Sequence, residues 1–415
     1  MLDLLAALAW YSGGVNIEQL HTWVFPRDVV LQRYSDRYLQ GMAQQGFPAT
    51  DQGVWVQTTN RLLIDHQGDR PLPAASVTKV ATSLAVLDKY PPDHRFITRI
   101  GTTGTLRNGT LTGDLVVIGG NDPLFVWEEA MAIANALNRL GIRTVKGNLV
   151  IVPPFSMNFY PNPDTAAELF KLALDHPSWP AEAQAAYTEH LQGQPRPQLT
   201  ISGTTRLQAT PPANVTIRLE HRSLPLLEIV RQMNIYSNNE IADTLAELAG
   251  GAATVAQIAA RKANVPAQEV QLINGSGLGV ENRISPRAAC GMLLALQQNL
   301  AAKNYSLADV LPMAGRDGGT LDDRQLPAAT LVKTGSLWNV SALVGVLPTA
   351  KHGTVCFALL NGGGNLWGFR AGQDRYVQHL SQTLQPGQQR GPEFQSHAPS
   401  PRFGDPQRIR VITAL

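Results

Sequence analysis

The sequence contains very little cysteine, with only Cys290 and Cys356 among 415 residues. Two cysteines exclude a disulfide framework and any CxxC metal site. A single disulfide is an open alternative, and two inert buried thiols are the favoured prediction. The nine histidines form no HExxH motif and no close pair, so their spacing predicts no metal site.

The chain also lacks a strong charge of either sign. Its formal net charge is +2, and no run of Lys or Arg forms the basic stripe that nucleic acid requires. Nucleic-acid binding is therefore not expected. The apolar content of 44% is typical of a folded protein. Because 415 residues exceed one compact core, we expect two or three domains.

Long hydrophobic runs are missing as well. No stretch reaches the eighteen or so apolar residues of a membrane span. A short apolar run from Leu4 to Trp10 follows Asp3, where a secretory signal needs positive charge. Three interpretations stay open: the protein is cytoplasmic, its true start lies upstream, or this run is a degenerate signal or anchor. Membrane association stays open with them.

Hydrophobic periodicity predicts the elements around residue 76. Residues 53–66 read as a β-hairpin. A helix begins at Ser76, because apolar residues then recur at helical spacing, and it ends at the Pro91-Pro92 pair. Strands with glycine-rich turns follow from about residue 98. Further helices are expected over 127–141, 164–176, 224–234 and 238–250, and from the Ser285-Pro286 pair onward.

Three strands with short connections are expected near the C-terminal end, over 329–336, 340–348 and 354–362. Short connections predict an antiparallel sheet. A last helix over about 372–384 precedes a tail rich in Pro, Gln and Gly. That composition predicts a mobile extension.

The sequence SVTK places Ser76 three residues before Lys79, and none of the other lysines has a serine at this spacing. Residues i and i+3 share a helix face, so the amine could reach the hydroxyl. To act as a base near neutral pH, Lys79 needs a pKa of about 7 in place of its reference value of about 10.4. Burial and a second nearby cation would both lower this pKa. The alternative is an ordinary helix start with a solvated lysine.

The sequence KTGS, from Lys333 to Ser336, opens a predicted strand, and no other lysine is followed by Thr-Gly. Lys333 would supply the second cation. The hydroxyls of Thr334 and Ser336 would hold a substrate carboxylate. Gly335 has no Cβ, so a substrate backbone could pair along the strand edge. The alternative is a strand end with a glycine kink.

The pattern SxN occurs twice, at Ser156–Asn158 and at Ser237–Asn239. Ser237 lies at a break between two predicted helices, where a hydroxyl is not consumed by helix hydrogen bonds. We therefore favour Ser237 to relay a proton to a leaving amine, and Asn239 to donate to a substrate carbonyl.

The three motifs occur in the order SxxK, SxN, KTG, and together they resemble those of penicillin-recognising serine acyltransferases. More specifically, the chain resembles the D-alanyl-D-alanine carboxypeptidase/endopeptidase family, peptidase family S13, of class C low-molecular-mass penicillin-binding proteins. The number of residues between Ser76 and Ser237 is typical of this family, which carries inserted domains between these two motifs. Further similar segments are NGTLTGDLVVIGGNDPLF, LGIRTVKGNLVI, HRSLPLLEIVRQMNIYSNNEIADTL, NGSGLGVENRISP and LPMAGRDGGTL.

The resemblance implies a role for each motif residue. Ser76 would be the acylated nucleophile, Lys79 its base, and Ser237 with Asn239 the second motif. The oxyanion hole would consist of the backbone N–H groups of Ser76 and Ser336. Water would then hydrolyse the acyl-enzyme without a metal or cofactor. The implied partners are peptidoglycan stem peptides and β-lactams, and the implied location is the periplasm or cell envelope.

The implied fold is α/β (α+β), an antiparallel sheet flanked by helices with an inserted accessory domain. We expect a discontinuous catalytic domain over 50–97 and 218–384, an insert over 98–217, an N-terminal segment over 1–49 and a Pro/Gln-rich tail over 385–415. The expected function is cleavage of D-Ala-D-Ala bonds or D-amino cross-links. Two alternatives remain: a β-lactamase or esterase with the same motifs, and a catalytically silent cell-wall-binding scaffold.

Overall fold

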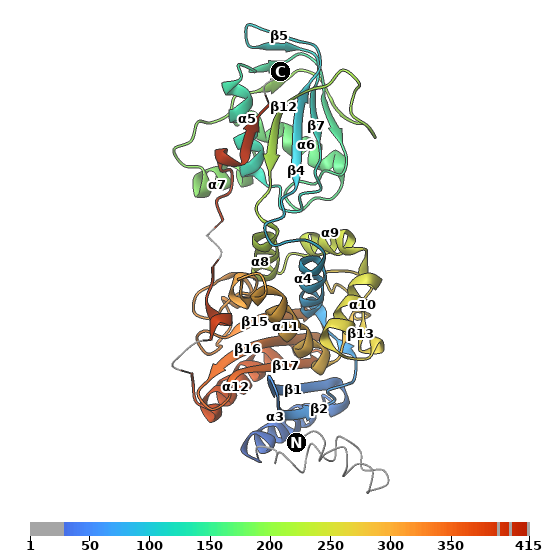
Figure 1. Ribbon diagram of the computed structural model, residues 1–415, viewed down its shortest axis with the longest axis vertical. Coiled ribbons are helices and arrows are strands. Elements are labelled where there is room, and N and C mark those ends of the chain that lie inside the picture. The colour runs from blue at the N-terminus through green and yellow to red at the C-terminus, as the bar shows by residue number, and fades with distance from the viewer. Residues whose placement is uncertain (1–28, 388–390, 398–400, 413–415) are drawn as a thin grey trace. The chain divides into compact units, whose positions relative to one another are not determined.

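The computed structural model describes residues 29–387, 391–397 and 401–412 (Figure 1). These residues form two compact units. The first contains the described residues up to Ala81, together with 256–273 and the described residues of 277–395. The second contains 82–255 and 274–276, together with the described residues from Ser396 onward. Each unit has its own sheets and helices.

A five-stranded antiparallel sheet is the centre of the first unit, with strand order β15-β16-β17-β1-β2. The hairpin predicted over 53–66 and the three antiparallel strands are confirmed. Strand β15 ends the order, so one of its edges has no neighbouring strand in this sheet. The bounds are β1 Gln52–Thr58, β2 Leu62–His66, β15 Leu331–Leu337, β16 Val340–Thr349 and β17 Gly353–Gly362.

Helices cover both faces of this sheet, because neighbouring residues of a strand point to opposite faces. Phe357 of β17 packs in one cluster with residues of α3 (Val29–Gln44) and α12 (Leu366–Leu384). The preceding residue, Cys356, points to α11 (Pro286–Ala301). A small sheet of β3 (Leu72–Pro73), β13 (Val270–Gln271) and β14 (Arg283–Ile284) completes the unit.

Cys290 and Cys356 form a disulfide between α11 and β17, with their Cα atoms 5.9 Å apart. The prediction of two buried thiols is therefore wrong. Residues 66 positions apart give no local sign of their pairing, and only the packing of α11 on the sheet brings them together.

Loss of this disulfide is expected to lower the free energy of unfolding of the first unit by about 2–4 kcal/mol, because the unfolded chain regains the freedom of a long loop. Urea denaturation with and without reductant measures this difference. The Cys290→Ala/Cys356→Ala variant should unfold at the lower urea concentration of the reduced wild type, whether or not reductant is present. Equal midpoints for reduced and oxidised wild type would contradict the expectation.

The second unit contains a mixed six-stranded sheet of order β11-β9-β7-β4-β12-β18 and a four-stranded sheet of order β10-β8-β6-β5. Helices α5 (Trp127–Arg139), α6 (Pro163–Ala173) and α7 (Ala181–His190) share one apolar core with the strands. The strand bounds are β4 Ile97–Thr102, β5 Thr105–Arg107, β6 Thr110–Thr112, β7 Leu115–Ile118, β8 Thr144–Val145, β9 Leu149–Val152, β10 Thr200–Ile201, β11 Thr205–Leu207, β12 Thr216–Arg222 and β18 Ile409–Val411.

Strand β18 lies in the tail that was predicted to be mobile. That prediction is therefore wrong for Ile409–Val411. It pairs antiparallel with β12. Arg408 and the backbone N–H of Gly404 both bind the buried carboxylate of Glu129. Composition alone could not reveal a partner almost 280 residues away, so the Pro- and Gln-rich sequence was misread.

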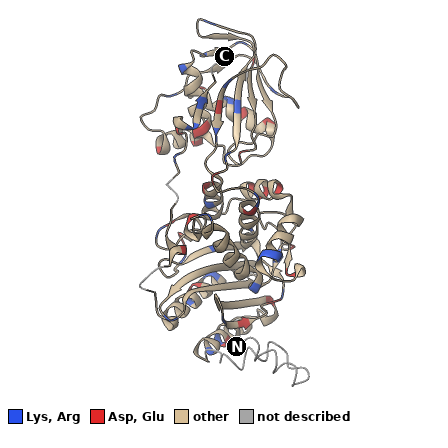
Figure 2. Ribbon diagram, viewed as in Figure 1, with Lys and Arg blue, Asp and Glu red and all other residues tan. Residues whose placement is uncertain are grey.

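Charged side chains of both signs are interspersed in the two units, and Figure 2 shows no continuous stripe of Lys and Arg on the described residues. None of the helices in the described ranges is long and apolar enough to cross a membrane. The run from Leu4 to Trp10 lies outside the described residues.

Candidate active site

Ser76 lies in a 3-10 turn, Ala75–Val77, that leads directly into α4 (Thr78–Lys89). Lys79 is fully buried, and its Nζ donates to Ser76 Oγ at 2.9 Å. This distance agrees with the spacing of the SVTK motif, since residues i and i+3 share a helix face. The alternative of a solvated lysine is excluded by its burial.

The backbone immediately before Ser76 is in an unusual conformation. Ala75 has a φ of 45°, in the left-handed region that residues with a Cβ rarely adopt. Gly277 lies directly against this residue, because a Cβ at position 277 would be 1.9 Å from the Ala75 carbonyl oxygen. Backbone strain of this kind is common at functional sites. The turn of Ser76 is therefore held by a close backbone contact that only glycine permits.

Lys333 provides a second buried amine beside Lys79. It is fully buried on β15, and its Nζ donates to the Thr334 carbonyl oxygen at 2.9 Å. Burial, and after it the charge of Lys79, holds the pKa of Lys333 well below its usual value. Two amines that repel each other in a site shielded from water favour a state with a single charge.

Gly335 allows β15 to lie against the turn of Ser76. A Cβ at this position would be 2.8 Å from the Ala74 carbonyl oxygen and 3.0 Å from the Ser76 nitrogen. The structure thus gives a reason for glycine at position 335: a larger residue would collide with the turn that contains Ser76. Pairing with a substrate would be a second reason. Lys333 is the third residue of β15, so KTGS lies inside the strand and does not open it.

Ser336 has a partner that sequence reasoning missed. Its Oγ accepts a hydrogen bond of 3.0 Å from Nη2 of Arg370 on α12. This helix begins at Leu366, where Asn365 caps the N–H of Gly368, and not at about 372 as predicted. The capping Asn365 was the available signal, because Asn is a preferred residue at a helix start.

Ser237 and Asn239 lie in the second unit, at the break between α8 (Leu226–Tyr236) and α9 (Asn239–Ala249). The predicted break between two helices is confirmed. Ser237 has a left-handed φ of 55°. In the other SxN sequence, Asn158 Oδ1 accepts from the Trp127 N–H at the start of α5, a structural role. The approach of Ser237 and Asn239 to Ser76 stays a prediction.

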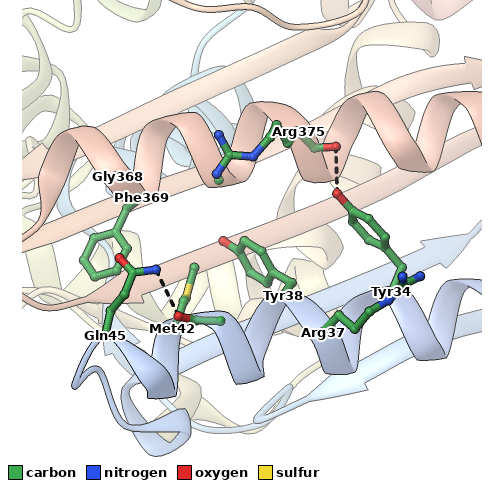
Figure 3. Close-up of a pocket in the computed structure, with 10 residues that line it drawn as sticks. Tyr34, Arg37, Tyr38, Met42, Gln45, Gly368, Phe369 and Arg375 are labelled. Atoms are coloured by element: carbon green, nitrogen blue, oxygen red, sulfur yellow. Dashed lines mark hydrogen bonds between the residues drawn. The ribbon is translucent and has the colours of Figure 1, made fainter.

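A pocket of about 260 Å³ lies elsewhere in the first unit, between α3 and α12. Figure 3 shows Tyr34 and Tyr38 projecting from α3, and Arg375 on the facing helix. Val332 packs with the α3 and α12 cluster, so its neighbour Lys333 points to the opposite face of the sheet. This pocket is therefore separate from the Ser76 site.

The D-Ala-D-Ala carboxypeptidase 3 (S13) family model matches residues 38–153 and 178–382. The chain belongs to this family. The matched ranges contain Ser76, Ser237 and Lys333, and the gap over 154–177 lies in the insert expected over 98–217. As an S13 member, the chain is a serine-type peptidase by family.

Two similar proteins are carboxypeptidases by name. D-alanyl-D-alanine carboxypeptidase DacB of Haemophilus influenzae is 23% identical over 401 residues, covering 73% of this chain and 83% of that protein. Carboxypeptidase DacB of Mycolicibacterium smegmatis is 29% identical over 160 residues, covering 34% of this chain and 35% of that protein.

Two solved structures share the fold. The predatory peptidoglycan endopeptidase Bd3459 of Bdellovibrio bacteriovorus superposes with a TM-score of 0.72 at 22% identity, covering 87% of this chain and 98% of that one. Penicillin-binding protein 4 of H. influenzae gives a TM-score of 0.62 at 18% identity, covering 84% and 99%. The predicted fold class, helices around an antiparallel sheet of the penicillin-binding-protein type, is confirmed.

Proposed function

We propose that the chain is a serine D-Ala-D-Ala carboxypeptidase or D,D-endopeptidase that cleaves peptidoglycan stem peptides through an acyl-Ser76 intermediate. The observation that carries this proposal is the 2.9 Å hydrogen bond between the buried Lys79 amine and Ser76 Oγ. The charge of Lys79 helps to lower the pKa of the buried Lys333, and by the same repulsion a charge on Lys333 would favour a neutral Lys79. A neutral lysine amine can accept the serine proton.

Acylation begins with a proton transfer from Ser76. Ser76 transfers its proton to the neutral Nζ of Lys79 while Oγ attacks the carbonyl carbon of the D-Ala residue before the scissile bond. The oxyanion is held by the backbone N–H groups of Ser76 and Ser336. The C–N bond breaks as the leaving amine takes a proton relayed through Ser237. Water hydrolyses the ester and restores Ser76.

The role of Ser237 is supported by the helices on which the motifs lie. Asn234 Nδ2 of α8 donates to Ser83 Oγ of α4 at 3.1 Å. Ser83 is one helical turn beyond Lys79, and Ser237 is about one turn beyond Asn234. This contact lies within the second unit, one turn from Ser237, and the approach of Ser237 to Lys79 is part of the proposal.

The strand that carries KTGS would bind the C-terminal end of the substrate peptide. Thr334 and Ser336 would hold the carboxylate of the leaving residue, and Asn239 would donate to a substrate carbonyl. A β-lactam would acylate Ser76 as a mimic of this substrate. In support, one structure of Bd3459 is described as acylated by penicillin G, and one of H. influenzae penicillin-binding protein 4 as complexed with a β-lactam. A location in the periplasm would suit such a substrate.

Release of D-Ala from a peptidoglycan pentapeptide, compared with cleavage of a cross-linked dimer, tests this proposal. The wild type is expected to cleave at least one of them, and Ser76→Ala neither, because the nucleophile is lost. The matched control is Ser202→Ala, since Ser202 is an exposed serine of the second unit and its loss should leave the rate unchanged. Ser76→Ala protein with the wild-type rate would refute the proposal.

A further inference from the structure

Arg370 is the charged side chain of α12 that contacts the KTGS strand. Its Nη2 donates to Ser336 Oγ at 3.0 Å, and the guanidinium lies over the Trp367 ring, 5.1 Å from the centroid. Its Nε is buried and has no hydrogen-bond partner among the described residues. The side chain is thus fixed at Ser336 with unused hydrogen-bonding capacity.

No carboxylate in the described part of the chain lies within ion-pair distance of Arg370. Asp374, one helical turn further on, pairs instead with Arg324 at 2.6 Å. Burial, and after it the charge of Arg324, lowers the pKa of the Arg370 guanidinium. Asp323 and Asp374 act on this pKa in the opposite sense, but neither forms an ion pair with Arg370. An anion arriving at Ser336 would therefore stabilise this partly buried cation further.

The hydrogen bond also dictates where the Ser336 hydroxyl proton points. A guanidinium has only donors, so the Ser336 oxygen is the acceptor and its O–H must serve another acceptor. Among the described residues, no acceptor lies within hydrogen-bond distance of this O–H. It is therefore available to a ligand oxygen.

We propose that Arg370 is a positioning residue that makes the site selective for substrates with a free α-carboxylate on the leaving residue. It orients the Ser336 hydroxyl toward that carboxylate and supplies the compensating positive charge. This inference rests on the proposed function. Both a terminal D-Ala and a D-amino cross-link with a free carboxylate satisfy it, whereas an amidated or esterified end does not.

Two substrates test the selectivity: an N-acetylated peptide ending in D-Ala-D-Ala and the same peptide with a C-terminal amide. The wild type is expected to prefer the acid. Arg370→Gln should lower kcat/KM for the acid by about 10- to 100-fold, the value of a hydrogen bond that involves a charge, and change that for the amide less than threefold. Arg370→Lys keeps the charge and should recover part of the preference.

Arg375→Gln is the matched control, because Arg375 is an exposed arginine of the same helix that lines the separate pocket in Figure 3. It should keep the wild-type preference, and thermal unfolding should show that all variants are folded. Equal losses on acid and amide, or no loss on either, would overturn the role of Arg370 alone. A folded wild type that cleaves neither peptide, nor the cross-linked dimer, would overturn the proposed function together with this inference.

Discussion

Replacement of Lys79 by methionine is expected to slow acylation of Ser76 by a fluorescent penicillin by about 10²- to 10⁴-fold, the usual contribution of a general base. The substitution removes the amine that lies 2.9 Å from Ser76 Oγ. Methionine has a similar length and suits the fully buried position. The loss should therefore come from the chemistry and not from unfolding, which circular dichroism can check.

The control for this variant is Lys89→Met. Lys89 is the exposed lysine at the last residue of the same helix, α4, so its replacement should leave the acylation rate within a factor of two. Acylation of a folded Lys79→Met protein at the wild-type rate would mean that another group takes the serine proton.

Replacement of Arg408 by methionine is expected to lower the free energy of unfolding of the second unit by about 3–5 kcal/mol, the cost of breaking a buried ion pair from one side. Arg408 binds Glu129, whose side chain is 2% exposed. His221 Nε2 contacts the other oxygen of this carboxylate at 2.7 Å. Chemical denaturation, monitored by the hydrogen exchange of backbone amides in each unit, should assign the loss to the second unit.

The pH dependence of this contribution has a definite sign. Burial by itself raises the pKa of Glu129, but His221 and Arg408 together lower it to about 2. A carboxylate with a lowered pKa stabilises the folded state above its unfolded value of about 4.3, and this stabilisation is lost as the pH falls toward 2. Loss of Arg408 should move the acid transition to higher pH.

Arg410→Met is the control, because Arg410 is an exposed arginine two residues further on, in strand β18. Its replacement should change the free energy of unfolding by less than about 0.5 kcal/mol. Equal stabilities of Arg408→Met and wild type at pH 7 would show that the ion pair of Arg408 does not stabilise the second unit.

The parts of the site that the sequence revealed are those with local signatures. Ser76 and Lys79 are three residues apart on one helix, and Lys333 to Ser336 are consecutive on one strand, so spacing and strand alternation predict their geometry. The break at Ser237 is likewise visible because the helical pattern stops and restarts around it.

The features that were missed depend on pairings between distant residues. Arg370 reaches Ser336 from a helix 34 positions away, and Glu129 meets Arg408 across most of the chain. Helix α7 was missed for a different reason: only Ala183 and Tyr187 of it are buried, which leaves no apolar periodicity to detect. The domain bounds predicted at residues 98 and 218 stay a prediction, although β4 and β12 pair with each other beside them.

The mass of the intact protein after exposure to benzylpenicillin tests the central claim most directly. The account predicts that one penicillin molecule adds to each wild-type molecule, that the adduct lies on the peptide containing Ser76, and that Ser76→Ala protein gains no mass. Turnover of the drug without an adduct would indicate a β-lactamase, and neither adduct nor turnover a silent scaffold. An adduct on any residue other than Ser76, or an equal adduct on the Ser76→Ala protein, would contradict the account.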